Sequence, residues 1–160
     1  MKIIFIRHGK PAVPEFGKLN GNEFQQWITA YNQASLDTGQ RPPSQLINLE
    51  GQCKTIVCSD LRRSIESAEL LGIQKIDCMD TVFREVELPY CRKPTSKLSP
   101  GLWSVIFRVL WFMGYAPNCE SKVLARQRAV LAADILEKKA LSNDTVVLVG
   151  HSIFNSFIGK

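Results

Sequence analysis

Short apolar runs stand at the start, the middle and the end of the chain. Residues 2–6, 55–58 and 145–149 are rich in Val, Ile and Phe and have the length of strands. Runs without polar alternation are typical of parallel sheets that are buried on both faces. A further short strand is expected between residues 75–77 and 81–83.

Longer stretches between these runs carry apolar residues at helical spacing. They predict helices over residues 22–34, about 60–71, 102–113 and 121–141. The first would place Phe24, Trp27, Ile28 and Tyr31 on one face, and the last would have Leu124, Val130, Leu131, Ile135 and Leu136 among its apolar positions. Strands that alternate with helices predict an α/β fold, a three-layer sandwich with a mainly parallel central sheet and helices on both faces.

Polar residues and glycine mark the expected ends of the second helix. Ser59 or Asp60 is placed to cap its start, and Gly72 is placed to stop it. Residues 10–50 are rich in proline and glycine, and residues 89–101 hold three prolines. Both segments are therefore expected to be irregular, apart from the first helix.

The composition is that of an ordinary globular protein, with 45% hydrophobic and 22% charged residues among 160. Because no repeat, low-complexity tract or linker is present, residues 1–160 are expected to form a single domain. The net charge of +5 favours anionic ligands weakly. Nucleic-acid binding would need a clustered basic face, and Lys and Arg are instead scattered, so we expect no nucleic-acid partner.

Cysteine spacing and the apolar stretches exclude other classes of protein. The five cysteines form no CxxC pair, which argues against a zinc site or a disulfide framework and predicts reduced thiols in a cytoplasmic protein. Four apolar residues after Lys2 are too few for a signal peptide. Residues 102–116 are the most apolar stretch, but they are too short for a membrane span and contain Arg108, so we expect no membrane contact.

The only two histidines of the chain stand where the first and last strands end. His8 lies between Arg7 and Gly9, and His151 follows Gly150. Open α/β sheets bind ligands at the carboxyl ends of their strands, so neighbouring strands would bring both imidazoles to one site. A lone histidine at a strand end is usually structural. The equivalent placement of two leaves a shared functional site and coincidence as even alternatives.

Arginine and glutamate follow other expected strand ends. Arg62 and Arg63 lie where a strand gives way to a helix, and guanidinium groups at a helix start suit a phosphate. Either arginine could equally form a surface ion pair. Glu85 or Glu87 could donate a proton to a leaving oxygen if its pKa were raised, although a loop glutamate is usually simply exposed.

Taken together, these segments resemble those of the histidine phosphatase superfamily, the phosphoglycerate-mutase-like proteins. Arg7, His8 and Gly9 follow the first strand, and residues 59–64 follow the second. A glutamate lies near the middle of the chain, and the Gly-His pair follows the last strand. A lone Arg-His-Gly is a weak signal, but four segments in this order are a strong one, and they span nearly the whole chain.

The resemblance implies a role for each position. His8 would accept the phosphoryl group as phosphohistidine, and the family pattern Ser-x-Leu-x-Arg prefers Arg63 to Arg62 as a phosphate ligand. Glu85 would protonate the leaving oxygen, with Glu87 as the alternative. The implied catalytic residues are His8, Glu85, His151, Arg7 and Arg63, and the implied substrate-binding residues are Arg7, Gly9, Arg63, His151 and Ser152. No metal and no cofactor are implied.

The chain also departs from the family pattern. Lys10 and Pro11 stand where an acidic or amide residue and then a small residue are common, and Pro14 stands where an asparagine would contact phosphate. Ser152 replaces the glycine that usually follows the second histidine, and no apolar-Thr-x-x-Gly segment is clear in residues 46–53. Nine residues after the second histidine leave room for a short final helix.

We therefore expect a metal-independent phosphatase that hydrolyses a small phosphomonoester through phosphohistidine on His8. One alternative is a phosphohistidine protein phosphatase, which the small size of the chain suits. Another is a non-catalytic phosphate-binding module with the same fold, which the altered Lys10, Pro11 and Ser152 favour. A mutase is less expected, since mutases of the family carry more inserted structure.

The segments that flank the expected site should determine the substrate, namely residues 10–50 and 89–119. Four rings of the apolar helix, Trp103, Phe107, Trp111 and Phe112, could cover an apolar leaving group. Core packing of the same helix is the simpler expectation for most of them.

Overall fold

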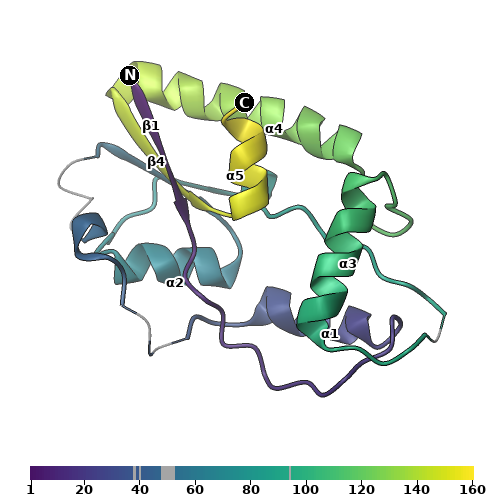
Figure 1. Ribbon diagram of the computed structural model, residues 1–160. Coiled ribbons are helices and arrows are strands. Elements are labelled where there is room, and N and C mark those ends of the chain that lie inside the picture. The colour runs from purple at the N-terminus through teal and green to yellow at the C-terminus, as the bar shows by residue number, and fades with distance from the viewer. Residues whose placement is uncertain (38, 40, 48–52, 94) are drawn as a thin grey trace.

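The computed structural model describes residues 1–160 apart from 38, 40, 48–52 and 94 (Figure 1). Its centre is a sheet of four parallel strands in the order β1–β4–β2–β3. The strands are β1 (Lys2–Arg7), β2 (Thr55–Ser59), β3 (Cys78–Asp80) and β4 (Thr145–Gly150). All four expected strands are confirmed. The expected absence of a Thr-x-x-Gly pattern concerns residues 46–53, most of which lie outside the described residues.

Helices lie on both faces of the sheet. They are α1 (Phe24–Gln33), α2 (Arg62–Leu70), α3 (Pro100–Phe112), α4 (Lys122–Asn143) and α5 (Ser152–Ile158), with short 3-10 turns η1 (Ser44–Leu46) and η3 (Thr81–Phe83). Figure 1 shows α2 on one side of the sheet and α4 with α5 on the other. The predicted α/β sandwich is therefore confirmed, and α5 is the short final helix that the sequence leaves room for.

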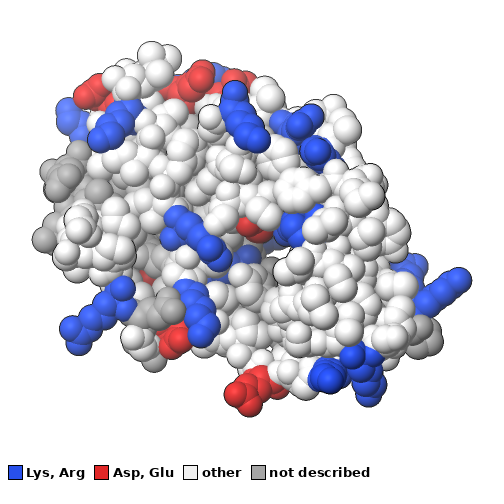
Figure 2. Space-filling model, in the orientation of Figure 1, with Lys and Arg blue, Asp and Glu red and all other residues white. Residues whose placement is uncertain are grey.

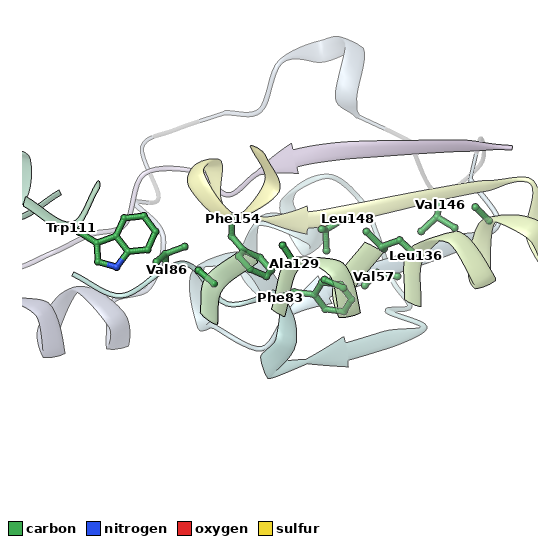
Figure 3. Packing of buried hydrophobic residues seen from close by; sticks show 12 residues of the cluster. Val57, Phe83, Val86, Trp111, Ala129, Leu136, Val146, Leu148 and Phe154 are labelled. Atoms are coloured by element: carbon green, nitrogen blue, oxygen red, sulfur yellow. The ribbon is translucent and has the colours of Figure 1, made fainter. Parts of the chain in front are cut away.

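Two apolar cores explain the unbroken strand runs. On one face, Val57 and Leu148 pack with Leu136 of α4 and Phe154 of α5 (Figure 3). On the other face, residues of opposite parity along the same strands pack against α2. Because successive strand side chains point to opposite faces, a sheet covered on both sides needs apolar residues at every position.

The buried face of α4 differs from the predicted one. Its fully buried positions are mostly small, namely Ala125, Ala129, Ala132, Leu136 and Ala140. Val130 and Leu131, expected among its apolar contacts, are 62% and 60% exposed, and Leu124 is exposed as well. The prediction is confirmed for Leu136 and Ile135, which pack in the core, and wrong for the other three. Alanine gives a weak hydrophobic signal, yet its small side chain lets a helix approach a sheet closely.

The helix ends show which capping signals hold. Ser59 belongs to β2, and the N-cap of α2 is Leu61, which makes no side-chain cap. The predicted cap at Ser59 or Asp60 is therefore wrong. Gly72 does end the helix, with a φ of +81° that favours glycine. Helix α3 begins at Pro100, inside the expected loop, because Ser99 accepts a hydrogen bond from the Leu102 N–H.

Helices α1 and α3 form a separate layer on the side toward which β1 points (Figure 1). Phe24 of α1 stacks on Phe107 of α3 at 5.4 Å between centroids, and Trp103 stacks on Phe107 at 5.0 Å. Trp111 is fully buried, whereas Phe112 is 45% exposed. Three of the four rings thus pack in cores, as the simpler expectation had it. No helix in the described ranges is long and apolar enough to cross a membrane.

Candidate active site

The two histidines meet because the first and last strands of the chain are neighbours. The register pairs Arg7 of β1 with Gly150 of β4, so each histidine follows directly after its strand. The rings of His8 and His151 lie 4.9 Å apart between centroids at 62° to one another. Both are buried, with 7% and 0% of their surfaces exposed. The predicted convergence at the carboxyl edge of the sheet is present.

His8 is held in one tautomer, with the proton on Nδ1 and the lone pair on Nε2. Its Nδ1 lies 2.6 Å from the carbonyl oxygen of Gly9, which can only accept, so Nδ1 carries the proton. The lone pair is therefore on Nε2. Burial lowers the pKa of His8 to about 4, and the charges of Arg63 and Arg7 lower it further against the opposing effect of the Gly9 bond. His8 is thus a neutral imidazole near pH 7.

Arg63, from the first turn of α2, reaches His8 through the core. It is 1% exposed, and its Nε donates to Nε2 of His8 at 3.3 Å. Its Nη1 donates to the Tyr31 carbonyl at 3.2 Å, and its guanidinium lies 4.8 Å from the centroid of the Tyr31 ring. Arg62 instead pairs on the surface with Glu66 at 2.7 Å. Of the two arginines, the structure brings Arg63 to the histidines.

His151 is fixed by two serine hydroxyls, which the sequence did not predict to be its hydrogen-bond partners. Its Nε2 lies 3.0 Å from Oγ of Ser59 and 3.3 Å from Oγ of Ser64. Burial lowers its pKa to about 2, aided by the charge of Arg63. Within the described part of the chain, its Nδ1 has no hydrogen-bond partner. A neutral His151 therefore has one ring nitrogen held by hydroxyls and one available to a ligand.

Asn155 was also missed, and it positions the second histidine. Its Oδ1 accepts from the backbone N–H of His151 at 3.3 Å, and its Nδ2 donates to the Ile6 carbonyl at 3.3 Å. A Cβ on Gly150 would lie 2.7 Å from that Oδ1, so a larger residue there would displace the Asn155 side chain from these hydrogen bonds. The sequence signal was a polar residue four positions after the histidine, one helical turn away.

Glu85 reaches the site from the segment after η3. Its Oε1 accepts from the N–H groups of Val86 and Phe154, both at 3.0 Å, and its Oε2 accepts from the Ile153 N–H at 3.3 Å. The carboxylate therefore covers the start of α5. Ser152, at that same start, is exposed and lies outside the residues that line the neighbouring cavities.

Two cavities adjoin this cluster and share Tyr31. One, of about 570 Å³, is lined by Arg7, His8 and Gly9. The other, of about 770 Å³, is lined by Arg63, by Glu85 and Glu87, and by residues of α1 and α3. Figure 2 shows basic and acidic side chains gathered around a hollow in this face. Arg7 and Gly9 thus line the smaller cavity beside the cluster, and both glutamates line the larger one.

The altered positions after His8 lie at its outer rim. Lys10 is exposed, with its Nζ 3.8 Å from Oδ2 of Asp37. Pro11 is buried and forms a β-bridge with Leu36, and Pro14 is exposed. Within the described ranges, no three side chains of His, Cys, Asp or Glu are grouped to hold a metal.

Comparison with known proteins places the fold. No model of a protein family and no curated protein matches the chain. The solved structure of the open reading frame Rv3214 from Mycobacterium tuberculosis matches with a TM-score of 0.65 at 19% identity, over 98% of this chain and 76% of that one. A mycobacterial glucosyl-3-phosphoglycerate phosphatase matches with a TM-score of 0.60 at 22% identity, over 98% and 76%. TTHB049 from Thermus thermophilus matches with a TM-score of 0.58 at 21% identity, over 98% and 82%.

Proposed function

We propose that this chain, which has the phosphoglycerate-mutase-like fold of the histidine phosphatase superfamily, is a phosphatase that hydrolyses a small phosphomonoester. The observation that carries the proposal is the state of His8, a buried neutral imidazole whose Nε2 lone pair faces Arg63 beside a second histidine. The similar mycobacterial phosphatase has been solved with inorganic phosphate and with VO3, the kind of anion this arrangement suits.

The reaction proceeds in two displacements. Nε2 of His8 attacks phosphorus while the bond to the ester oxygen breaks, and Arg63 and Arg7 hold the phosphoryl oxygens. His151 donates from Nδ1 to the same group, since its Nε2 can accept from a serine hydroxyl. Water then attacks the phosphohistidine, which releases phosphate and restores His8. These side chains supply the positive charge, so the proposed reaction is metal-independent.

Glu85 is the proton donor to the leaving oxygen in this scheme. Its Oε1 accepts two backbone N–H groups, whereas Oε2 has a single bond of 3.3 Å and is the freer oxygen. We therefore assign the transferred proton to Oε2. In the second step the same oxygen takes the proton of the attacking water. Glu87 lines the same cavity but is exposed, which favours Glu85.

The cavity beside Arg63 supports a small ester over a protein substrate. Its volume of about 770 Å³ falls in the range of small-molecule sites. We expect the wild-type protein to release phosphate from small esters faster than from a phosphohistidine protein. The reverse ranking would support the protein phosphatase instead.

Trapping the intermediate tests the chemistry directly. The protein is mixed with 4-nitrophenyl phosphate, quenched without acid and digested, and His8 is examined by mass spectrometry. Phosphate on His8 is the expected result, and the His8→Asn variant is the control. Phosphate that stays bound without turnover, and without labelled His8, would indicate the non-catalytic module.

A further inference from the structure

The larger cavity holds four arginines that differ in their partners: Arg63, Arg84, Arg108 and Arg128. Arg84 donates from Nε to Asp60 at 2.7 Å. Arg128 contacts both carboxylate oxygens of Glu120, at 2.8 and 2.6 Å. Across the described residues, the other two arginines form no ion pair. Two cations in this cavity therefore lack a carboxylate of their own.

Arg63 is buried and Arg108 is half-buried, with its Nη1 out of contact with solvent. Desolvation lowers the pKa of both, whereas the hydrogen bond that Arg84 donates to Asp60 raises that of Arg84. A buried cation without an anion is unfavourable, and a bound anion relieves that cost. For Arg63 the anion is the phosphoryl group of the proposed reaction. Arg108 forms no ion pair with any of the described residues.

The contacts of Arg108 leave part of its guanidinium unused. Nη2 donates to the carbonyl of Val86 at 2.9 Å, and the group lies 5.5 Å from the centroid of the Trp111 ring. Nη1 is buried and, among the described residues, has no hydrogen-bond partner. These contacts fix the side chain at the cavity wall and leave its charge without a salt bridge.

The proposed proton donor lines the same cavity as the two arginines. The charge of Glu85 raises the pKa of both Arg63 and Arg108, so its carboxylate lies near both. A substrate with its phosphoryl group at Arg63 and its leaving oxygen at Glu85 would extend along the cavity toward Arg108. The cavity also has apolar side chains in its wall, with Trp27, Ile28 and Leu88 among its residues.

We propose that Arg108 binds a second anionic group on the leaving alcohol, so that the preferred substrates are phosphomonoesters with an apolar or aromatic body and an anionic end. This inference rests on the proposed function. It makes Arg108 a specificity-determining residue that acts on the leaving group, away from the phosphorus atom. The anion is a carboxylate or a second phosphate-like group, since a guanidinium binds both in the same bidentate way.

Matched esters test the charge at the far end of the substrate. Wild-type kcat/KM is measured for 4-carboxyphenyl phosphate, 4-phosphonophenyl phosphate and the neutral 4-carbamoylphenyl phosphate. We expect at least one anionic ester to be preferred over the amide by about tenfold or more, the scale of a hydrogen bond to a charged group. The better anionic ester tells carboxylate from phosphate-like recognition.

Variants assign the preference to one side chain. Arg108→Gln should bring the kcat/KM ratio of the anionic to the neutral ester to near unity, and kcat/KM for the amide ester should stay within a few-fold of wild type. Arg108→Lys should restore part of the preference for the anionic ester. Arg62→Gln removes an equal charge outside the cavity and should keep the preference. A wild-type protein that treats the anionic and neutral esters alike, or a preference that survives in Arg108→Gln, would overturn the inference.

A binding measurement separates this inference from the proposed chemistry. Calorimetry with the non-hydrolysable 4-carboxybenzyl, 4-phosphonobenzyl and 4-carbamoylbenzyl phosphonates needs no turnover. If no ester is hydrolysed but an anionic phosphonate binds more tightly in an Arg108-dependent way, the proposed phosphatase activity fails and the anion site stands. If esters are hydrolysed without any preference for charge, the activity stands and the anion site fails.

Discussion

The carboxyl edge of the sheet and the α1–α3 layer are built by different contacts. At the sheet edge, His8, Arg63 and His151 are buried and held by specific hydrogen bonds. In the α1–α3 layer the main contacts are stacked rings, such as Phe24 on Phe107. The hydrogen bonds at the sheet edge hold individual atoms in place, as bond formation requires. The stacked rings of the α1–α3 layer hold the shape and volume of a cavity wall. Changes at the edge should therefore alter chemistry, and changes in the layer should alter which molecules fit.

Loss of the nucleophile should give the largest effect. His8→Ala removes Nε2 and with it the phosphohistidine route, so kcat should fall by about 10⁴-fold or more. Phosphate release from 4-nitrophenyl phosphate measures this loss, and circular dichroism checks that the fold is kept. Turnover like that of the wild type would show that the sheet edge is not the reaction centre.

Adjacent arginines give a matched test of the same edge. Arg63→Gln should lower kcat/KM by about 10²–10³-fold, the scale seen when a charge-stabilising donor is removed. Arg62→Gln, one residue away and paired with Glu66 on the surface, should stay within about twofold. Equal losses in both variants would mean that net charge, rather than the buried contact with His8, is responsible.

Glu85→Gln tests proton donation while keeping an oxygen that can accept from the start of α5. With an alkyl phosphate, whose leaving oxygen needs a proton, kcat should fall by about 100-fold. With 4-nitrophenyl phosphate, whose leaving group is stable as an anion, the loss should be much smaller. Glu87→Gln is the control, and a larger, substrate-dependent loss in that variant would reassign the donor.

A substitution in the α1–α3 layer should separate stability from chemistry. Phe107→Leu should reduce the free energy of unfolding by roughly 1–2 kcal/mol, because stacked ring contacts are replaced by a smaller side chain. We expect kcat for a small ester to change by less than about threefold, while KM for bulky esters rises. Urea unfolding and ester kinetics measure the two effects. A large loss of kcat on the small ester would show that the α1–α3 layer affects the chemical step as well.

The smallest expected change is the response of the histidines to mild acid. Burial lowers the pKa of His8 to about 4 and that of His151 to about 2, so both rings should remain neutral between pH 5 and 8. As the pH falls through about 4, His8 gains a proton on Nε2 and loses its nucleophilic lone pair. Ring resonances followed by NMR should show no titration near pH 6.5. A midpoint there would mean that these rings are solvated.

The sheet and its histidines were predictable because their signals are local and strong. Residues 145–149 are almost entirely buried, whereas residues 2–6 form an edge strand with Phe5 exposed, and both runs are apolar enough to predict strands without knowledge of their partners. Both histidines directly follow such runs. This predicted that they lie at one edge of the sheet, provided the two strands are neighbours. The family pattern Ser-x-Leu-x-Arg then distinguished Arg63 from Arg62.

Other parts of the site could not be predicted, since they depend on tertiary contacts. Ser59 was interpreted as a helix cap but lies in β2, where its hydroxyl contacts His151. Asn155 matters through a bond to the backbone of a residue that another element positions. Arg108 counted in the sequence only as a charge that interrupts an apolar stretch. Its place at the cavity wall follows from the contact between α3 and the Val86 carbonyl.

The pairing of β1 with β4 joins residues that the chain separates by more than 140 positions, as between Lys2 and Thr145. Such contacts form late, because a long loop must close before they contribute. During synthesis the first histidine emerges long before its neighbour, so a chain that has not yet reached β4 lacks the pair. Recovery of catalysis in a refolding experiment should therefore follow the slowest structural phase, and partly folded forms should be inactive.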